Sequence, residues 1–254
     1  MSFQPNLPLG KQPARADARN LLFKKLLVSP PSLPIMYDVD DDHSILSATR
    51  MFLNDVMGTC VIAGRAHQTV RFQILETSKQ INITDYDVRN EYLIETGGKD
   101  NGLQVLESLK LWRTRGWIAD GKRYRIKAFS EIQKSDFKNM MRAIYLNAGI
   151  GMGLQLPYSA RQQFYDGKIW DISQSGRPDA ALWGGHYVYV TGYDPIGLTC
   201  ITWGRKQKMT WDFVDVYADE AYAIIDAEDK SIKNVFNFDF LKTYLARRSP
   251  VENI

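Results

Sequence analysis

Two short segments, far apart in the chain, contain the residue types that thiol chemistry needs. The first is Asn54-Asp-Val-Met-Gly-Thr-Cys60, and the second runs from Gly184-Gly-His186 to Gly192-Tyr193. A cysteine attacks as its thiolate, which the unpaired N–H groups and the dipole at the start of a helix stabilise. A histidine at the start of a strand opposite that helix accepts the thiol proton. The two segments therefore predict a thiolate–imidazolium pair made by Cys60 and His186.

These motifs resemble those of the papain-like cysteine peptidases. That family places its cysteine at the start of a central helix, its histidine in a Gly-His-apolar strand, and an Asn-Ser-Trp-Gly motif after it. The matching residues in this chain are Cys60, His186, Gly192-Tyr193 and Ile201-Thr202-Trp203-Gly204, with Asp100-Asn101-Gly102 before a helix. The family's oxyanion-hole glutamine precedes the cysteine by six residues, where this chain has the carboxamide Asn54. The resemblance spans about residues 45–226 and implies hydrolysis of a peptide or protein substrate without a cofactor.

The third catalytic position departs from the family pattern. Alignment on Trp203-Gly204 puts Ile201 where the family has its asparagine, and a shift of one residue puts Thr202 there. A hydroxyl accepts a hydrogen bond from an imidazole N–H, though more weakly than a carboxylate does. Three interpretations stay open: Thr202 orients His186, the enzyme uses a Cys-His dyad, or the enzyme is inactive.

A narrower resemblance is to the papain-like proteins encoded by tailed phages and prophages, and it rests on the segments 9–15, 54–67 and 202–211. This resemblance implies a location in the host cytoplasm or in the virion, with other virion proteins as partners. It leaves two functions open. One is a cysteine peptidase, and the other is a catalytically inactive papain-fold protein with a structural or interaction role in the virion. Hydrolysis of another amide, such as a peptidoglycan crosslink, would use the same thiolate chemistry.

The overall composition argues against several other classes of function. The 254 residues are 44% hydrophobic and 24% charged, as in soluble globular proteins, and the net charge of +3 forms no basic stripe that would grip nucleic acid. No apolar run reaches the roughly 18 residues that a membrane span needs, and the start lacks the apolar stretch of a secretory signal. Two cysteines and three histidines without ligand spacing predict neither a disulfide framework nor a metal site.

The elements that would position Cys60 and His186 can be predicted from hydrophobic spacing. Helices are expected from Cys60 toward Lys79 with Thr59 as the cap, and over 85–95, 103–115 and 211–219, the last capped by Thr210. Strands are expected at 150–156, 186–193, 198–203 and 221–225, with a hairpin turn at 194–197. Because helices precede strands, the sequence predicts an α+β fold with a helical lobe at 46–146, a β lobe at 147–226 and a cleft between them.

The two ends of the chain are expected to lie outside this domain. Residues 1–45 hold six of the ten prolines and read as an N-terminal extension, and residues 227–254 read as a C-terminal tail. We expect the extension to form no independent domain and either to lie across the body, where it could cover the cleft as a propeptide does in similar enzymes, or to reach a partner. The carboxylates Asp219 and Glu220 are expected on a solvated helix face.

The remaining candidates have simpler expected roles. His67 is expected to be a structural helix residue, and His43, which follows three aspartates, is expected to be solvated. Cys200 lies in a strand and is expected to fill space. Trp203 resembles the family's tryptophan that shields the histidine, or else it is a core residue of a strand.

Overall fold

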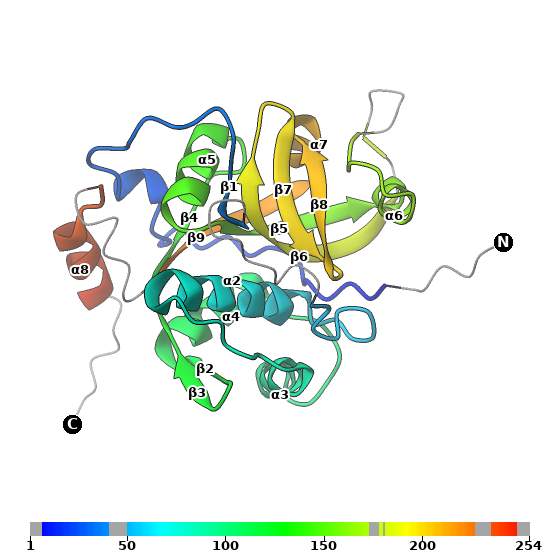
Figure 1. Ribbon diagram of the computed structural model, residues 1–254, viewed down its shortest axis with the longest axis horizontal. Helices are drawn as coiled ribbons and strands as arrows, with labels where there is room; N and C mark the ends of the chain where they lie inside the picture. Colours follow the sequence, from blue (N-terminus) through cyan, green and yellow to red (C-terminus); the bar gives the residue numbers. More distant parts are fainter. Residues whose placement is uncertain (1–6, 41–49, 173–177, 180, 227–234, 248–254) are drawn as a thin grey trace.

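The structure is a computed structural model that describes residues 7–40, 50–172, 178–179, 181–226 and 235–247 (Figure 1). His43 lies outside these residues. The helices are η1 (Phe23–Lys25), α2 (Cys60–Thr77), α3 (Asp85–Thr96), α4 (Val105–Thr114), α5 (Phe137–Leu146), α6 (Tyr158–Tyr165), α7 (Trp211–Tyr217) and α8 (Phe238–Ala246). The strands are β1 (Tyr37–Asp38), β2 (Trp117–Ala119), β3 (Lys122–Tyr124), β4 (Ile126–Glu131), β5 (Ile150–Pro157), β6 (Leu182–Tyr193), β7 (Gly197–Thr202), β8 (Arg205–Thr210) and β9 (Ala218–Asp226).

One large antiparallel sheet organises the molecule. Its strands follow the order β4-β9-β5-β6-β7-β8, and β1 pairs with β6. On β5, Leu154 lies opposite His186 of β6, and Gly153 lies opposite Glu220 of β9. The register therefore brings β9 close to the part of β6 that contains His186.

Alternation along β9 shows why the sheet has a core on each face. Tyr222 and Ile224 pack in one apolar cluster with residues of α2, α3 and α4, whereas Ala223 and Ile225 pack in a second cluster with residues of α5 and α7. Successive side chains of a strand point to opposite faces, so a strand buried on both faces is apolar throughout. Figure 1 shows α2, α3 and α4 together on one side of the sheet and α5 and α7 on the other.

Helix α2 is the central helix, and it is buried at every residue from Cys60 to Phe72. It packs against β6, which contains His186. The predicted helix is confirmed and Thr59 is its N-cap residue, but the Thr59 hydroxyl donates to the carbonyl of Phe52 at 3.0 Å and makes no capping bond. By contrast, the Thr210 cap of α7 is confirmed, since Thr210 accepts from the N–H of Phe213 at 3.1 Å.

The structure corrects the predicted boundary between helix α7 and the strand after it. Helix α7 ends at Tyr217 and β9 begins at Ala218, so Asp219 and Glu220 lie on a strand rather than on a helix. Glu220 is buried, because the strand directs it toward Lys11. The expectation of a solvated helix face for Asp219 and Glu220 was wrong, because nothing in the apolar run 221–225 indicates at which residue the strand begins to pair.

Strands also occur in the half of the chain that was expected to be helical. The short hairpin of β2 and β3 and the strand β4 lie between α4 and α5, and β4 pairs with β9 in the large sheet. Charged residues interrupt these strands, so their apolar alternation is too short to stand out in the sequence.

The described part of the N-terminal extension lies along the body. Leu7, Leu21, Phe23 and Leu26 are buried in the core cluster that also holds α5. Phe23 meets Phe236 edge to face with ring centroids 5.7 Å apart, which joins the extension to the segment before α8. None of the helices that the structure describes is both long and apolar enough to cross a membrane.

Candidate active site

Cys60 begins α2 and faces β6 across the seam between the helix and the sheet. Its side chain is buried, with 1% of the residue exposed. Backbone groups of Tyr187, Gly10 and Val61 lie near its sulfur and lower the pKa of the thiol. Because Tyr187 follows His186 directly, the sulfur lies beside the backbone of the strand that contains the histidine. The structure thus brings the two sequence motifs together.

The loop before Cys60 is held by a carboxylate from the other end of the helical lobe. Asp100 accepts from the N–H of Gly58 at 3.0 Å and from the hydroxyl of Tyr92 at 2.6 Å. The Tyr92 oxygen accepts in turn from the N–H of Gly102 at 2.9 Å. Asp100 and Tyr92 therefore fix the nucleophile loop and the Asn101-Gly102 loop relative to each other.

His186 is fully buried on β6, and Thr202 and Trp203 hold its ring in place. Its Nε2 lies 2.6 Å from Thr202 Oγ1, a hydrogen-bond distance, and its ring stacks on Trp203 with centroids 4.1 Å apart and planes at 14°. Among the residues the structure describes, its Nδ1 has no hydrogen-bond partner. Direct contact between Nδ1 and the Cys60 sulfur stays a prediction. The ring nevertheless keeps one nitrogen available for a proton.

Trp203 and Gly204 form the turn between β7 and β8, and that turn explains how Trp203 reaches His186. Both residues have positive φ, +43° and +74°, as a two-residue type I′ hairpin requires. The turn ends β7 at Thr202, so Thr202 and Trp203 lie side by side against the imidazole. The shielding role predicted for Trp203 agrees with this stacking, whereas the hairpin itself was missed, although the Trp-Gly pair marks it.

Asn54 lies in the turn before Cys60 and is buried, with 3% of the residue exposed. Its side-chain oxygen has no hydrogen-bond partner within the described parts of the chain. The preceding residues Phe52 and Leu53 both have positive φ, +54° and +59°, which gives the loop its tight path. The predicted role of the Asn54 amide in an oxyanion hole stays a prediction.

A segment of the N-terminal extension, residues 9–12, covers this seam, and we call it the covering segment. The N–H of Lys11 donates to the carbonyl of Gly185 at 3.1 Å, and the N–H of Gln12 donates to the carbonyl of Leu103 at 2.9 Å. A side chain at Gly10 would overlap the carbonyl of Gly58. Figure 1 shows the N-terminal trace running between α2 and the sheet. The covering segment therefore bridges both sides of the seam directly over Cys60.

The covering segment does not present its central carbonyls to the thiol. The carbonyl of Gly10 accepts from the N–H of Leu103 at 2.8 Å, and the carbonyl of Lys11 lies against Gly185. Attack by a thiol requires the reacting carbonyl carbon at about 3–3.5 Å from the sulfur in an aligned geometry. The contacts of the Gly10 and Lys11 carbonyls therefore show a segment that covers the thiol, not one that is bound as a substrate.

Burial under the covering segment favours the neutral forms of both reacting groups. It raises the pKa of the Cys60 thiol to about 11, and backbone hydrogen bonds and the charge of Lys11 only partly oppose this effect. Burial also lowers the pKa of His186 to about 3, and the charge of Lys11 acts in the same direction. Burial in the covered state therefore disfavours the charged forms that the predicted thiolate–imidazolium pair needs.

A buried ion cluster lies next to the pair. The ammonium of Lys11 is 2.7 Å from Asp219 Oδ2 and 3.2 Å from Glu220 Oε1, and the lysine side chain is fully buried. Gln155 donates to Asp219 Oδ2 at 2.9 Å. Sequence reasoning missed this cluster because its three charges come from positions 11, 219 and 220.

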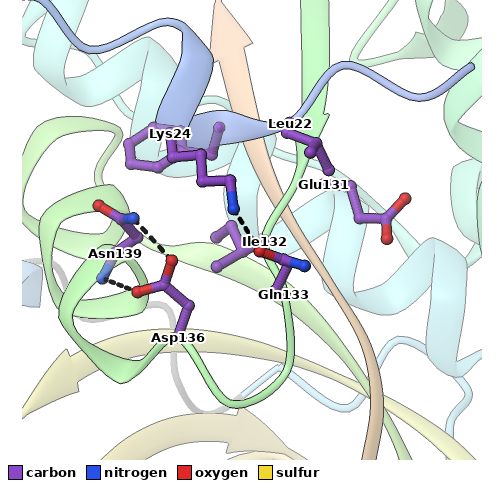
Figure 2. A pocket seen from close by; sticks show the side chains of 8 residues that line it. Leu22, Lys24, Glu131, Ile132, Gln133, Asp136 and Asn139 are labelled. Carbon is purple, nitrogen blue, oxygen red and sulfur yellow. Dashed lines mark hydrogen bonds between the residues drawn. The ribbon is translucent and has the colours of Figure 1, made fainter.

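Other candidate sites in the described part of the chain carry less chemistry. Cys60 and Cys200 are both free thiols, and Cys200 is buried in β7. No three His, Cys, Asp or Glu side chains gather there as a metal ion requires. Figure 2 shows a pocket between η1, the end of β4 and the start of α5, where Lys24 donates to Gln133 and Asp136 accepts from Asn139. Its polar groups bind one another, so we assign it no function.

Comparisons with known proteins show the fold. No family model and no curated protein sequence matches the chain. Xylellain, a cysteine protease from Xylella fastidiosa, is similar in structure, with a TM-score of 0.68 and 15% identity over 89% of this chain and 99% of that one. Procathepsin B S9 from Trypanosoma congolense has a TM-score of 0.56 and 10% identity over 87% of each chain. The Carica candamarcensis cysteine protease CMS1MS2 has a TM-score of 0.54 and 11% identity over 76% and 99%. The predicted papain-like α+β fold is confirmed.

Proposed function

We propose that this chain is a cysteine peptidase held in a covered state by its own N-terminal extension. The observation that supports this most is the arrangement of His186, whose Nε2 lies at Thr202 while its Nδ1 has no partner among the described residues. A histidine fixed in this way offers one nitrogen to a thiol, and the backbone of the next residue, Tyr187, lies near enough to Cys60 to lower the pKa of its thiol. The cysteine proteases with the same fold support the same reaction class.

The reaction follows from these groups once the covering segment has left. His186 takes the thiol proton, and the Cys60 sulfur forms a bond to the substrate carbonyl carbon. The Asn54 amide and the Cys60 N–H then hold the oxyanion. His186 gives its proton to the leaving amine as the C–N bond breaks, and water next cleaves the thioester with His186 as base. Departure of the covering segment favours the charged forms of the pair, because it returns solvent to both groups and removes the Lys11 charge that also lowers the pKa of His186.

The test uses Gly10→Val, whose added side chain cannot fit against Gly58 and so displaces the covering segment. We expect this variant to cleave members of a peptide library, detected by mass spectrometry, and the native chain to cleave them slowly. Adding Cys60→Ala should abolish cleavage. Adding Cys200→Ala is the matched control, since that buried thiol lies in β7, and it should leave cleavage intact. If Gly10→Val exposes Cys60 to a thiol reagent without any cleavage, the chain is an inactive protein of this fold.

A finer part of the proposal concerns origin and setting. The segments 9–15, 54–67 and 202–211 support a protein encoded by a tailed phage or prophage. We propose that it acts in the host cytoplasm or within the virion, on peptide or protein substrates that include other virion proteins. Mass spectrometry of purified virions and of infected-cell cytoplasm should find the chain in one of the two. Its absence from both would contradict this setting.

A further inference from the structure

The buried cluster of Lys11, Asp219 and Glu220 has the form of an occupied ligand site. Two carboxyl groups face one ammonium, so the acidic groups of the cluster outnumber its cation, and burial raises the pKa of Glu220. Both carboxylates are fixed by other side chains: Gln155 donates to Asp219 at 2.9 Å, and Tyr222 donates to Glu220 Oε2 at 3.1 Å. The anionic side of the cluster therefore keeps its geometry without help from the lysine.

The shape of the site matches a long aliphatic side chain. The stem of Lys11 passes over Gly153 of β5, where an added Cβ would overlap Lys11 Cε and would lie 2.7 Å from Glu220 Cγ. Any other residue at this position would close the passage to the two carboxylates. Gly153 is not one of the glycines with a positive φ, so its backbone conformation does not require glycine. The reason for a glycine here is the space that the stem of Lys11 occupies.

The location of the site ties it to the reacting groups. Gly10 packs against the backbone of Gly58, two residues before Cys60, and the residue after Gly10 supplies the lysine. The Lys11 N–H donates to Gly185, the neighbour of His186. A side chain in this site therefore belongs to a residue that lies beside the nucleophile.

We propose that Gly153, Asp219 and Glu220 form a specificity pocket for a lysine or arginine side chain of the substrate, which Lys11 fills in the covered state. The proposal rests on the proposed peptidase function. When the covering segment leaves, the two carboxylates lose their counter-charge, and an unpaired buried charge is costly. A substrate with a basic side chain restores the charge balance, whereas an apolar or acidic side chain does not. Asp219 Oδ1 accepts no hydrogen bond within the described residues, and Glu220 Oε1 faces the Lys11 ammonium at 3.2 Å, so both oxygens can accept from a guanidinium once Lys11 has left.

The test measures binding, so that it does not depend on turnover. The full chain with Gly10→Val and Lys11→Ala has a displaced cover and an empty pocket, and Cys60→Ala prevents cleavage. Fluorescence polarisation follows alanine-rich peptides in which one lysine, arginine, norleucine or glutamate moves through each position. We expect lysine and arginine peptides to bind at least tenfold more tightly than norleucine peptides in one register. Adding Glu220→Gln or Asp219→Asn should reduce that preference at least tenfold, and Glu107→Gln, which alters an exposed pair with Lys110, should leave it unchanged.

Two results overturn the pocket: equal binding of lysine and norleucine peptides, or no binding of any basic peptide by a chain whose melting curve shows that it is folded. The two proposals fail in different ways. If basic peptides bind preferentially but the Gly10→Val variant cleaves no peptide, the pocket is supported and the peptidase function is rejected. If the Gly10→Val variant cleaves peptides but binds basic peptides no more tightly than others, the peptidase function is supported and the pocket is rejected.

Discussion

Two buried clusters of charge differ in how their ions are held. In the helical lobe, Arg65 of α2 meets Glu91 at 2.9 Å and Glu95 at 2.8 Å, and both carboxylates belong to α3. Its guanidinium also donates to the carbonyl of Ser108 of α4 at 3.0 Å. At the seam, by contrast, the carboxylates of β9 meet a cation from the covering segment. We call these the Arg65 cluster and the Lys11 cluster.

This difference indicates that the Arg65 cluster stabilises the fold, whereas the Lys11 cluster can take part in ligand binding. Every partner of the Arg65 cluster named above lies on a helix of one packed core, so the cluster cannot open without unfolding. The Lys11 cluster loses its cation as soon as the covering segment moves. The buried polar atoms without a hydrogen bond in the described residues include three near this segment: Asn54 Oδ1, His186 Nδ1 and Asp219 Oδ1. Polar atoms that a removable segment leaves unsatisfied are suited to bind a ligand in its place.

The largest expected effect concerns the Arg65 cluster. Arg65→Met leaves Glu91 and Glu95 buried beside fewer partners and should lower the free energy of unfolding by about 3–5 kcal/mol. Urea unfolding measures this loss. The control is Arg89→Met, which alters an exposed arginine of α3 and should cost less than about 0.5 kcal/mol. A loss below about 1 kcal/mol for Arg65→Met would show that the cluster does not hold the helices together.

The next effect is the pH dependence that His186 brings to stability. Burial lowers its pKa from 6.5 to about 3, so the unfolded chain takes up a proton on this residue at a higher pH than the folded chain does. Its stabilising contribution is therefore full above pH 6.5 and falls as the pH falls toward 3, by about 1.4 kcal/mol per pH unit. His186→Gln should remove about 2.3 kcal/mol of the difference in unfolding free energy between pH 6.5 and 4.5, because the unfolded histidine is already half protonated at pH 6.5. Parallel pH profiles of the two chains would show that His186 is solvated.

Local patterns in the sequence predicted much of the fold and the site. Alternation and helical spacing placed α2, α3, β5 and the hairpin of β6 and β7, because those signals lie within single segments. Gly97 and Gly116 end α3 and α4 with positive φ, +64° and +69°, a conformation that glycine adopts easily. Thr202 was one of two alternatives for the orienting residue, and its 2.6 Å distance to His186 favours it over Ile201.

The Lys11 cluster could not be predicted in the same way. Lys11 looks like any lysine of a proline-rich, basic extension, and Asp219 and Glu220 follow a short helix whose end the sequence does not mark. Only the antiparallel pairing of β5 with β9 puts Gly153 opposite Glu220 and so creates the passage that Lys11 fills. Contacts between residues more than 200 positions apart depend on the register of the sheet and not on local propensity.

A smaller effect tests the removable nature of the Lys11 cluster. Lys11→Met keeps the aliphatic stem but loses both ion pairs, so the covering segment should leave the seam more often. We expect a thiol reagent to label Cys60 about tenfold faster, equivalent to about 1.4 kcal/mol. Lys24→Met is the matched control, because that lysine also belongs to the extension but binds the neutral side chain of Gln133 at 2.7 Å. An unchanged labelling rate would mean that backbone hydrogen bonds alone hold the cover.

The smallest effect concerns Thr202, which distinguishes an oriented histidine from a dyad. If Nε2–H of His186 donates to Thr202, Thr202→Val in the Gly10→Val background removes one neutral hydrogen bond, worth about 1 kcal/mol. The value of kcat/KM for the best peptide should then fall about fivefold, mainly through kcat, because the substrate does not touch the hydroxyl. Thr202→Ser keeps an acceptor and should restore most of the rate. The same rate with valine would mean that stacking on Trp203 alone orients the ring, since that contact, at 4.1 Å between centroids, does not involve the Thr202 side chain.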